Sequence, residues 1–256
     1  MINKGFILSI NEILERLNLT DSILKENKNL KTLNLLISAF LQEIPYENLD
    51  FFHKKIPSFH LSNIYEKIVE NNRGGICYEN NTLFAYLLDE LGFDVYMIFC
   101  KIKDTTYISS DFPHLALIVK LNNKSYLVDV GFGQNVREAL DTNNDKYISV
   151  YEDIEYYIKT NKNTFSLFSR YKDDKEKETY SFDLTKVSLR DYENIFDKVI
   201  KDVNTVTLLV SKASKEGRIT LNDSFLSIKT KDLKRKWEIS SENKYEVLRD
   251  YFNIHV

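Results

Sequence analysis

The hydrophobic pattern of this sequence changes at Gly92, and that change constrains the fold more than any other feature. Before Gly92, apolar residues recur at three- and four-residue steps, which predicts amphipathic helices. The clearest example is segment 30–44, whose apolar face contains Leu30, Leu33, Leu36, Ile37, Phe40 and Leu41. From Phe93 to about Phe182, short β-branched and aromatic runs between polar turns predict strands. From about Leu189 the pattern is mixed, with two helices and two strands.

The charge balance and the cysteine content narrow the function class. The 35 Lys and Arg residues nearly balance the 38 Asp and Glu residues, giving a net charge of −3. This balance gives no electrostatic reason to expect nucleic acid or an anionic membrane as a partner. The first residues turn polar too soon for a signal peptide, and no apolar run approaches a membrane span. With two cysteines and no secretory signal, we expect free thiols and a cytoplasmic location.

The stretch "RGGICYENN" places two adjacent glycines before Cys77 in a chain that has only seven glycines. Paired glycines allow a sharp turn and a close approach of another segment. A helix that begins near Cys77 would direct its free amide groups and its positive dipole end at the sulfur, which stabilises a thiolate. The alternative is a small buried residue at a helix start. Cys100, inside the apolar run "YMIFCKI", is expected to be a core residue.

A cysteine nucleophile needs a base and a group that orients the base. Three of the four histidines are weak candidates, because they lie beside polar, basic residues or the C-terminus: His53, His60 and His255. His114 begins the apolar run "HLALIV", and Asp129 lies in "YLVDVGFG" on the next predicted strand of a hairpin turning at "LNNK". We expect Asp129 to accept from Nδ1 of His114, leaving Nε2 for Cys77. The alternatives are an edge histidine and an aspartate that caps the turn.

Four ordered motifs then resemble the arylamine N-acetyltransferase family. "RGGICYENN" resembles its Arg-Gly-Gly-x-Cys-x-Glu-x-Asn motif, and "IPYENLDF" resembles its Ile-Pro-Phe-Glu-Asn-Leu segment, with Tyr46 in place of Phe. "HLALIV" and "YLVDVGFG" resemble the strands that carry the catalytic histidine and aspartate of the family. The order and spacing agree over about residues 12–133, roughly half of the chain.

The resemblance implies an α+β fold with three domains: an N-terminal helical bundle (1–91), a central antiparallel β-barrel (92–188) and a small, shortened α/β lid (189–256). It also implies ping-pong acetyl transfer from acetyl-CoA to arylamines or arylhydrazines, or to the oxygen of N-hydroxyarylamines, as in xenobiotic metabolism. Cys77 would be the nucleophile, His114 the base and Asp129 the group that orients it. No metal is expected.

Other positions acquire roles only through the resemblance. Tyr46 and Phe132 match aromatic positions that line the acceptor pocket of the family, although ordinary core packing explains them equally well. Ser110 lies in the loop before His114 that approaches the cofactor, so it is a candidate for binding CoA. Arg73 and Glu79 are interpreted as an ion pair that braces the turn at Cys77.

The chain departs from the family pattern where specificity is decided. No proline follows "DVGFG", and "VIKDVNTVTLLVSK" lacks the Asn…Pro-x-Ser-x-Phe stretch that often enters the third region. Loops and lids usually set ligand choice. Two alternatives to the arylamine reaction therefore stay open: an amide synthase or acyltransferase that uses another acyl thioester, and a non-catalytic protein that binds a small molecule. A cysteine protease or transglutaminase shares the triad geometry but not the flanking motifs.

Overall fold

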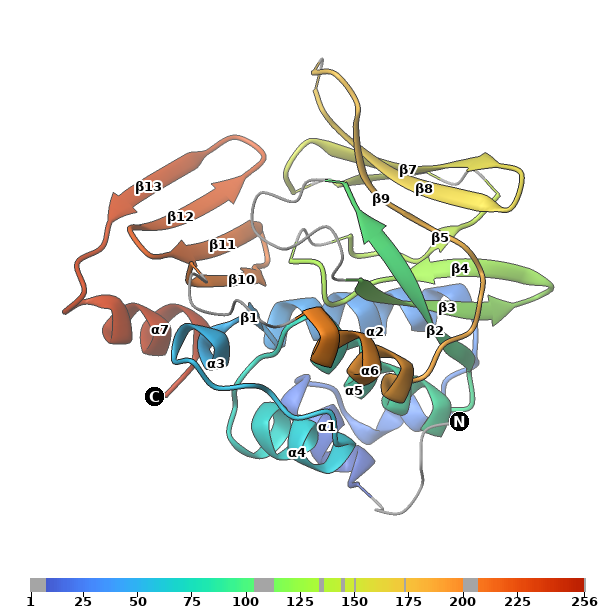
Figure 1. The fold of residues 1–256 in the computed structure, drawn as a ribbon, viewed down its shortest axis with the longest axis horizontal. Coiled ribbons are helices and arrows are strands. Elements are labelled where there is room, and N and C mark those ends of the chain that lie inside the picture. The colour runs from blue at the N-terminus through green and yellow to red at the C-terminus, as the bar shows by residue number, and fades with distance from the viewer. Residues whose placement is uncertain are drawn as a thin grey trace.

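The structure is a computed structural model, and it describes residues 8–103, 113–133, 136–143, 146–149, 151–172, 174–199 and 207–255. Helices gather on one side of the molecule and two antiparallel sheets lie on the other (Figure 1). The predicted α+β class is confirmed. The division into three domains at residues 91/92 and 188/189 stays a prediction.

The N-terminal part is helical, as its hydrophobic period predicts. Two of its helices begin at side-chain caps: Ser9 Oγ accepts from Glu12 N at 3.2 Å, and Asn29 Oδ1 accepts from Thr32 N at 3.0 Å. Such caps satisfy amide groups that have no partner within the helix. The elements are α1 (Ile10–Arg16), the 3₁₀ helix η1 (Asp21–Lys25), α2 (Leu30–Glu43), α3 (Leu49–Phe52), α4 (Leu61–Tyr65), the π-helical turn η2 (Glu66–Glu70) and α5 (Cys77–Glu90).

Helix α5 lies at the centre of the molecule. Its pattern predicts one apolar face, but every residue from Cys77 to Leu88 is buried, including four consecutive polar residues, Glu79 to Thr82. A helix that is buried all round has core contacts on each side. The polar residues must therefore find hydrogen-bond partners inside the protein. The helix ends at Glu90 with Leu91 as its cap, and Gly92, the predicted terminator, follows with φ of +80°.

The central part is an eight-stranded antiparallel sheet that curls into a nearly closed barrel (Figure 1). Its spatial order is β5-β4-β3-β2-β9-β8-β7-β6. The predicted hairpin joins β3 to β4 through Asn122 and Asn123, both with positive φ. The strands are β2 (Asp94–Ile102), β3 (His114–Leu121), β4 (Lys124–Val128), β5 (Leu140–Asp141), β6 (Lys146–Ser149), β7 (Ile154–Asn161), β8 (Thr164–Tyr171) and β9 (Lys177–Phe182).

Strand β3 is buried on both faces. Leu115, Leu117 and Val119 pack into the cluster formed with the helices, whereas Ala116 and Ile118 pack inside the barrel. Successive side chains of a strand point to opposite faces. This double burial explains why "HLALIV" is a continuous apolar run, and it places His114 where the two hydrophobic clusters meet.

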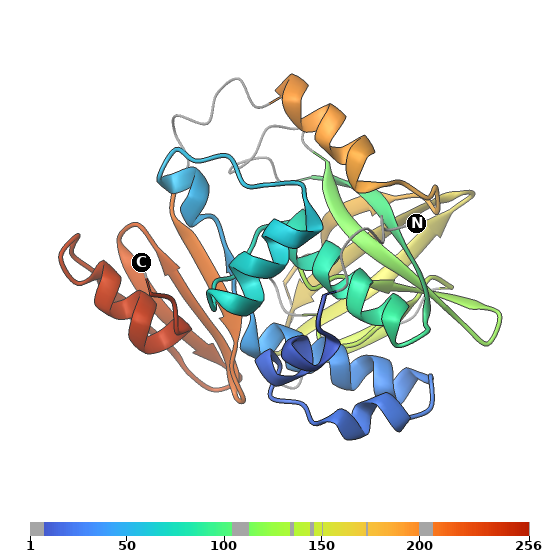
Figure 2. The ribbon, with the colours of Figure 1, turned by 90° about the horizontal axis from the view of Figure 1, so that it is seen from below.

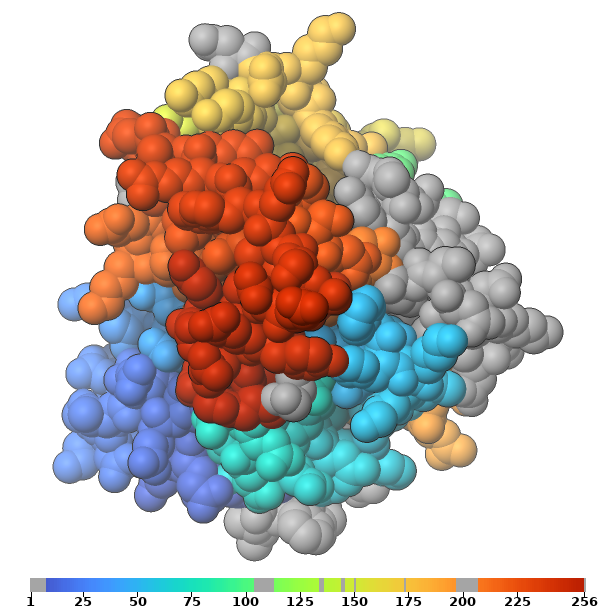
Figure 3. Space-filling model, turned by 90° about the vertical axis from the view of Figure 1, so that its left-hand side faces the viewer, coloured from blue at the N-terminus to red at the C-terminus, as the bar shows by residue number. Residues whose placement is uncertain are grey.

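The C-terminal sheet takes its first strand from the helical part. Its order is β1-β10-β11-β12-β13, and in β1 Tyr46 and Glu47 pair with Ser211 and Val210. Figure 3 shows that the C-terminal region, in red and orange, fills the centre of this side of the molecule. The elements are β1 (Tyr46–Glu47), β10 (Leu209–Ala213), β11 (Gly217–Asn222), β12 (Phe225–Thr230), β13 (Lys234–Glu238) and helix α7 (Lys244–Phe252).

Helix α6 (Leu189–Val199) follows the barrel and packs on the helices rather than on the C-terminal sheet. Figure 2 shows it, in orange, apart from the C-terminal strands and α7. Its Tyr192 and Phe196 join a cluster of aromatic rings with Phe59 and Tyr78. Within the described ranges, no helix combines the length and the apolar composition needed to cross a membrane.

Candidate active site

The paired glycines let the segment before Cys77 run against the start of β1. A Cβ atom on Gly74 would lie 2.0 Å from the carbonyl oxygen of Pro45, so only glycine fits there. Gly75 forms a parallel bridge with Tyr46, in which its carbonyl accepts from Glu47 N at 3.0 Å. The glycines therefore fasten the nucleophile turn to the strand that carries Tyr46.

Cys77 is the first residue of α5, as predicted. The amide of the preceding residue, Ile76 N, donates to Glu79 Oε2 at 3.0 Å. This is the bond of a capping box in which the side chain of the third helical residue accepts from the N-cap amide. The free amide groups and the positive end of this helix therefore lie beside the sulfur. Cys77 is 8% exposed, and Cys100 is buried in the barrel as expected. Burial raises the pKa of the Cys100 thiol well above its usual value.

The turn at Cys77 rests on partly buried ion pairs that differ from the predicted one. Lys67 Nζ lies 2.9 Å from Glu79 and 2.6 Å from Asp50, while Arg73 Nη2 lies 2.8 Å from Glu47 and 3.1 Å from Asp50. The expected Arg73–Glu79 pair is therefore wrong. Arg73 pairs with Glu47 of β1 and with Asp50 of α3, and Lys67, on η2, occupies the place beside Glu79. Burial raises the pKa of Glu79 against the opposing effect of Lys67, to about 7.

His114 and Asp129 lie together through the β3–β4 hairpin, as the sequence predicts. However, the ring nitrogen bonded to the carboxylate is Nε2, at 2.6 Å from Asp129 Oδ2. The predicted orientation, with Nδ1 towards Asp129, is wrong. Nδ1 is the nitrogen left for Cys77, which also contributes to the raised pKa of the imidazole. The sequence places the two residues on neighbouring strands, but the ring nitrogen that faces the carboxylate depends on the side-chain rotamer of His114.

Asp129 accepts hydrogen bonds from four donors. Oδ1 accepts from Asn81 Nδ2 and from Gly131 N, both at 3.0 Å. Oδ2 accepts from Tyr180 Oη at 3.0 Å and from His114. These four contacts compensate the loss of hydration of a buried carboxylate and fix its orientation.

The pKa of His114 is raised. Burial alone lowers it, but the charge and hydrogen bond of Asp129, together with Cys77, outweigh burial and raise it to about 10. An imidazolium therefore faces the nucleophile at neutral pH, which favours a thiolate–imidazolium pair.

The two aromatic residues predicted to line a pocket lie around this centre. The ring of Phe132 meets the His114 ring edge-on, with centroids 5.2 Å apart. Tyr46 lies beside Gly133, where an added Cβ would be 3.6 Å from its ring. Gly131 permits the approach of this turn to the nucleophile, because a Cβ there would be 2.7 Å from the Cys77 backbone. Ser110 lies outside the described residues.

Three residues near the triad were not predicted from sequence. Asn81, one helical turn after Cys77, also donates to Leu115 O at 2.7 Å and accepts from Val130 N at 3.1 Å. Its spacing from Cys77 is a signal that could have identified it. Tyr180 and Tyr192 come from distant segments, and nothing in their local sequence indicates that they reach the site.

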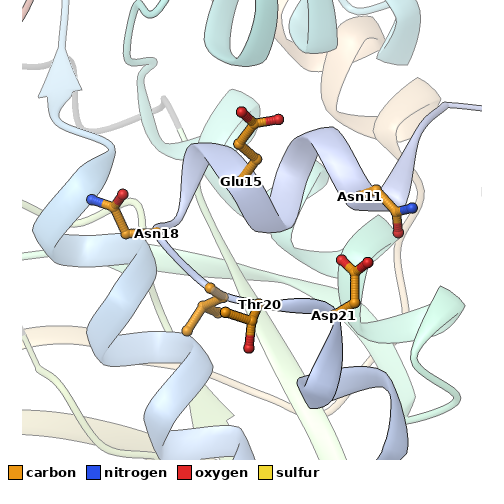
Figure 4. Close-up of a pocket in the computed structure, with 6 residues that line it drawn as sticks. Asn11, Glu15, Asn18, Thr20 and Asp21 are labelled. Atoms are coloured by element: carbon orange, nitrogen blue, oxygen red, sulfur yellow. The ribbon is translucent and has the colours of Figure 1, made fainter.

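Two further features of the described residues bear on the search for a site. Among them, no group of three or more His, Cys, Asp or Glu side chains could hold a metal ion. A surface pocket lies beside α1 and η1 (Figure 4). Its lining has no thiol or imidazole, and consists of Asn11, Glu15, Asn18, Leu19, Thr20 and Asp21.

Comparisons with known proteins show which family this chain resembles. A family model described as N-acetyltransferase matches residues 29–256. The pineal gland arylamine N-acetyltransferase isozyme NAT-3 of Gallus gallus is 38% identical over 110 residues, which span 42% of this chain but only 38% of that relative.

Solved structures match the fold over nearly the whole chain. Arylamine N-acetyltransferase C of Bacillus anthracis has a TM-score of 0.82 at 26% identity, over 97% of this chain and all of that one. The Mycobacterium marinum arylamine N-acetyltransferase, solved in complex with CoA, has a TM-score of 0.83 at 23% identity, over 96% of this chain and 93% of that one.

Proposed function

The chain belongs to the N-acetyltransferase family, and on that premise we propose that it transfers an acetyl group from acetyl-CoA to the nitrogen of an arylamine or arylhydrazine, or to the oxygen of an N-hydroxyarylamine. The observation that carries this proposal is the buried alignment of Cys77, His114 and Asp129 at the start of α5. This arrangement supplies an activated nucleophile, a proton carrier and a group that orients the carrier.

In the first half-reaction, the Cys77 thiolate attacks the thioester carbonyl of acetyl-CoA. The tetrahedral adduct collapses with cleavage of the carbon–sulfur bond to CoA, and His114 gives its proton to the departing CoA sulfur. The product is an acetyl thioester on Cys77 beside a neutral imidazole. Asp129 holds the ring by Nε2, so Nδ1 is the nitrogen that moves the proton.

In the second half-reaction, the amine attacks the acetyl thioester and His114 accepts the proton that the nitrogen loses. The bond between the acetyl carbon and Cys77 then breaks and restores the thiolate–imidazolium pair. Phe132 and Tyr46 lie beside this centre and would hold the flat face of an aromatic acceptor.

Binding of the acyl donor and the cellular setting belong to the same proposal. The M. marinum relative was solved with CoA, which supports a CoA thioester as the donor here; Ser110 remains our candidate contact for it. Two buried free thiols fit the reducing conditions of the cytoplasm. We place the reaction there, in the metabolism of foreign amines.

The test is the intact mass of the protein after incubation with acetyl-CoA and no amine. We expect one added acetyl group, absent from Cys77→Ala and removed on addition of an arylhydrazine. Cys100→Ala is the matched control and should still be acetylated, because Cys100 lies in the barrel core. If acetyl-CoA gives no adduct but a longer acyl thioester does, that thioester takes the place of acetyl-CoA as the donor in this proposal. No adduct with any thioester would reject it.

A further inference from the structure

The nucleophile has a third polar neighbour besides the helix start and His114. The hydroxyl of Tyr192, on α6, lies 3.7 Å from Cys77 Sγ, within hydrogen-bond range for sulfur. Tyr192 is fully buried and Cys77 nearly so. This contact joins a segment that follows the barrel to a residue 115 positions earlier in the chain.

Two features hold Tyr192 in place. Its helix begins with a reciprocal cap, in which Ser188 Oγ accepts from Asp191 N at 3.2 Å and Asp191 Oδ2 accepts from Ser188 N at 2.8 Å. Its ring packs against Tyr78, with centroids 5.0 Å apart, and lies 6.1 Å from the ring of Phe99. The cap fixes the start of α6 and the packing fixes the ring, so the position of the Tyr192 hydroxyl is well defined.

The direction of this hydrogen bond follows from the protonation states. Burial, reinforced by the nearby Cys77, raises the pKa of Tyr192 well above its usual value, so the phenol keeps its proton. A thiolate has lone pairs and no proton to give. Tyr192 is therefore the donor and the Cys77 sulfur the acceptor.

We propose that Tyr192 is a further catalytic residue, whose hydroxyl donates to the Cys77 sulfur and stabilises it as an anion. This inference rests on the proposed function. The anion occurs twice in that reaction, first when the thiolate attacks the donor and again when the sulfur leaves the acetyl group. A fixed donor assists both steps because charge is on the sulfur in each.

The other titratable groups around Cys77 come from several elements. His114 and Asp129 come from the barrel side, and Tyr46 comes from β1. Tyr78 is the next residue on α5, and Cys100 lies in the barrel core. Burial raises the pKa of Tyr46 and of Tyr78 above the usual value, so both phenols stay neutral as Tyr192 does. Among these tyrosines, Tyr192 has the described hydrogen bond to the sulfur.

The test measures thiol reactivity and needs no acyl donor. The rate of alkylation by iodoacetamide is followed against pH for the wild type and Tyr192→Phe, with peptide mapping to confirm modification at Cys77. A hydrogen bond accepted by a charged sulfur favours the thiolate over the thiol. We therefore expect the midpoint of the rate profile to rise by about one pH unit, with a roughly tenfold slower rate on its acid side.

Tyr78→Phe is the matched control. It removes another buried hydroxyl from the same aromatic cluster, one that donates to Ser58 O at 3.4 Å and not to sulfur. We expect its alkylation midpoint to stay at the wild-type value. An equal shift in both variants, or no shift in Tyr192→Phe, overturns the proposal.

A second variant keeps the test decisive even if Tyr192→Phe does not fold. A fluorinated tyrosine at position 192 has a more acidic phenol and is a stronger donor, so it should move the midpoint in the opposite direction, to lower pH. An unchanged midpoint there also overturns the proposal. Because neither measurement uses acetyl-CoA, absence of acetyl transfer would reject the proposed function without deciding the role of Tyr192.

Discussion

The two sides of the triad are supported by opposite kinds of interaction. On the helical side, beneath the turn of Cys77, Glu47, Asp50 and Glu79 are met by the cations Lys67 and Arg73. On the barrel side, Asp129 is met by three neutral donors and by His114.

This difference predicts on which side the loss of one residue costs more stability. Removing a cation from this network leaves a carboxylate such as the fully buried Glu47 without its partner, which strongly destabilises the fold. Removing one neutral donor leaves the carboxylate with three others, and the loss is a single hydrogen bond. We therefore expect substitutions on the helical side to act on folding, and those on the barrel side to act mainly on the reactivity of the triad.

The largest effect is expected for Arg73→Ala. The variant leaves Glu47 and Asp50 short of a cation, so unfolding free energy should fall by about 3–5 kcal/mol, measured by urea denaturation. Lys103→Ala is the control: it breaks an exposed pair with Glu178 and should cost at most about 1 kcal/mol. A stable but inactive Arg73→Ala protein would place this residue in the chemistry instead.

An intermediate effect is expected for the pH dependence of stability. The folded pKa of His114 is raised from 6.5 to about 10, so its charged form stabilises the fold fully below pH 6.5 and ever less as pH rises to about 10. Asp129→Asn removes the charge that raises this pKa and should flatten the slope. Both proteins are compared in a Cys77→Ala background, so that the thiol does not contribute. Equal slopes would mean that Asp129 does not hold the imidazolium.

A smaller effect is expected for Asn81→Ala, which tests the link between the two sides. Asn81 lies on the helix of Cys77 but bonds Asp129, Leu115 O and Val130 N. Its loss should lower unfolding free energy by about 2 kcal/mol and slow acetylation of Cys77. Asn80→Ala is the neighbouring control, because Asn80 makes a weaker contact, to Pro45 O at 3.4 Å. Equal losses in the two variants would argue against a special role of Asn81.

The smallest effect is expected for Ser211→Ala, on the C-terminal sheet. Ser211 Oγ donates to Gly133 O at 3.1 Å, and Arg218 Nη1 donates to the same oxygen at 3.3 Å. One donor remains in the variant, so the loss of stability should not exceed about 1 kcal/mol. Since Gly133 adjoins Phe132, KM for the amine should rise while the rate of Cys77 acetylation stays unchanged. A slower acetylation step would show that this sheet supports the triad itself.

Local sequence patterns predicted the structure correctly wherever it depends on residues that are close together in the chain. The break in periodicity at Gly92 separates helices from strands, and the Gly-Gly-x-Cys turn starts a helix at Cys77. The hairpin at Asn122 and Asn123 sets His114 beside Asp129. Each follows from backbone preferences or from side-chain period within a few residues, which a sequence displays directly.

Packing decided the rest. Arg73 pairs with Glu47 and Asp50 rather than Glu79, Asp129 holds Nε2 rather than Nδ1, and Tyr180 and Tyr192 reach the site from distant segments. In each case several partners of suitable charge or polarity exist along the chain. The one that forms depends on side-chain directions across packed elements, which no local pattern specifies. The sequence by itself thus determined which chemical groups the site contains, and the tertiary structure decided how those groups are paired, because buried polar groups bond to whatever the fold brings within reach.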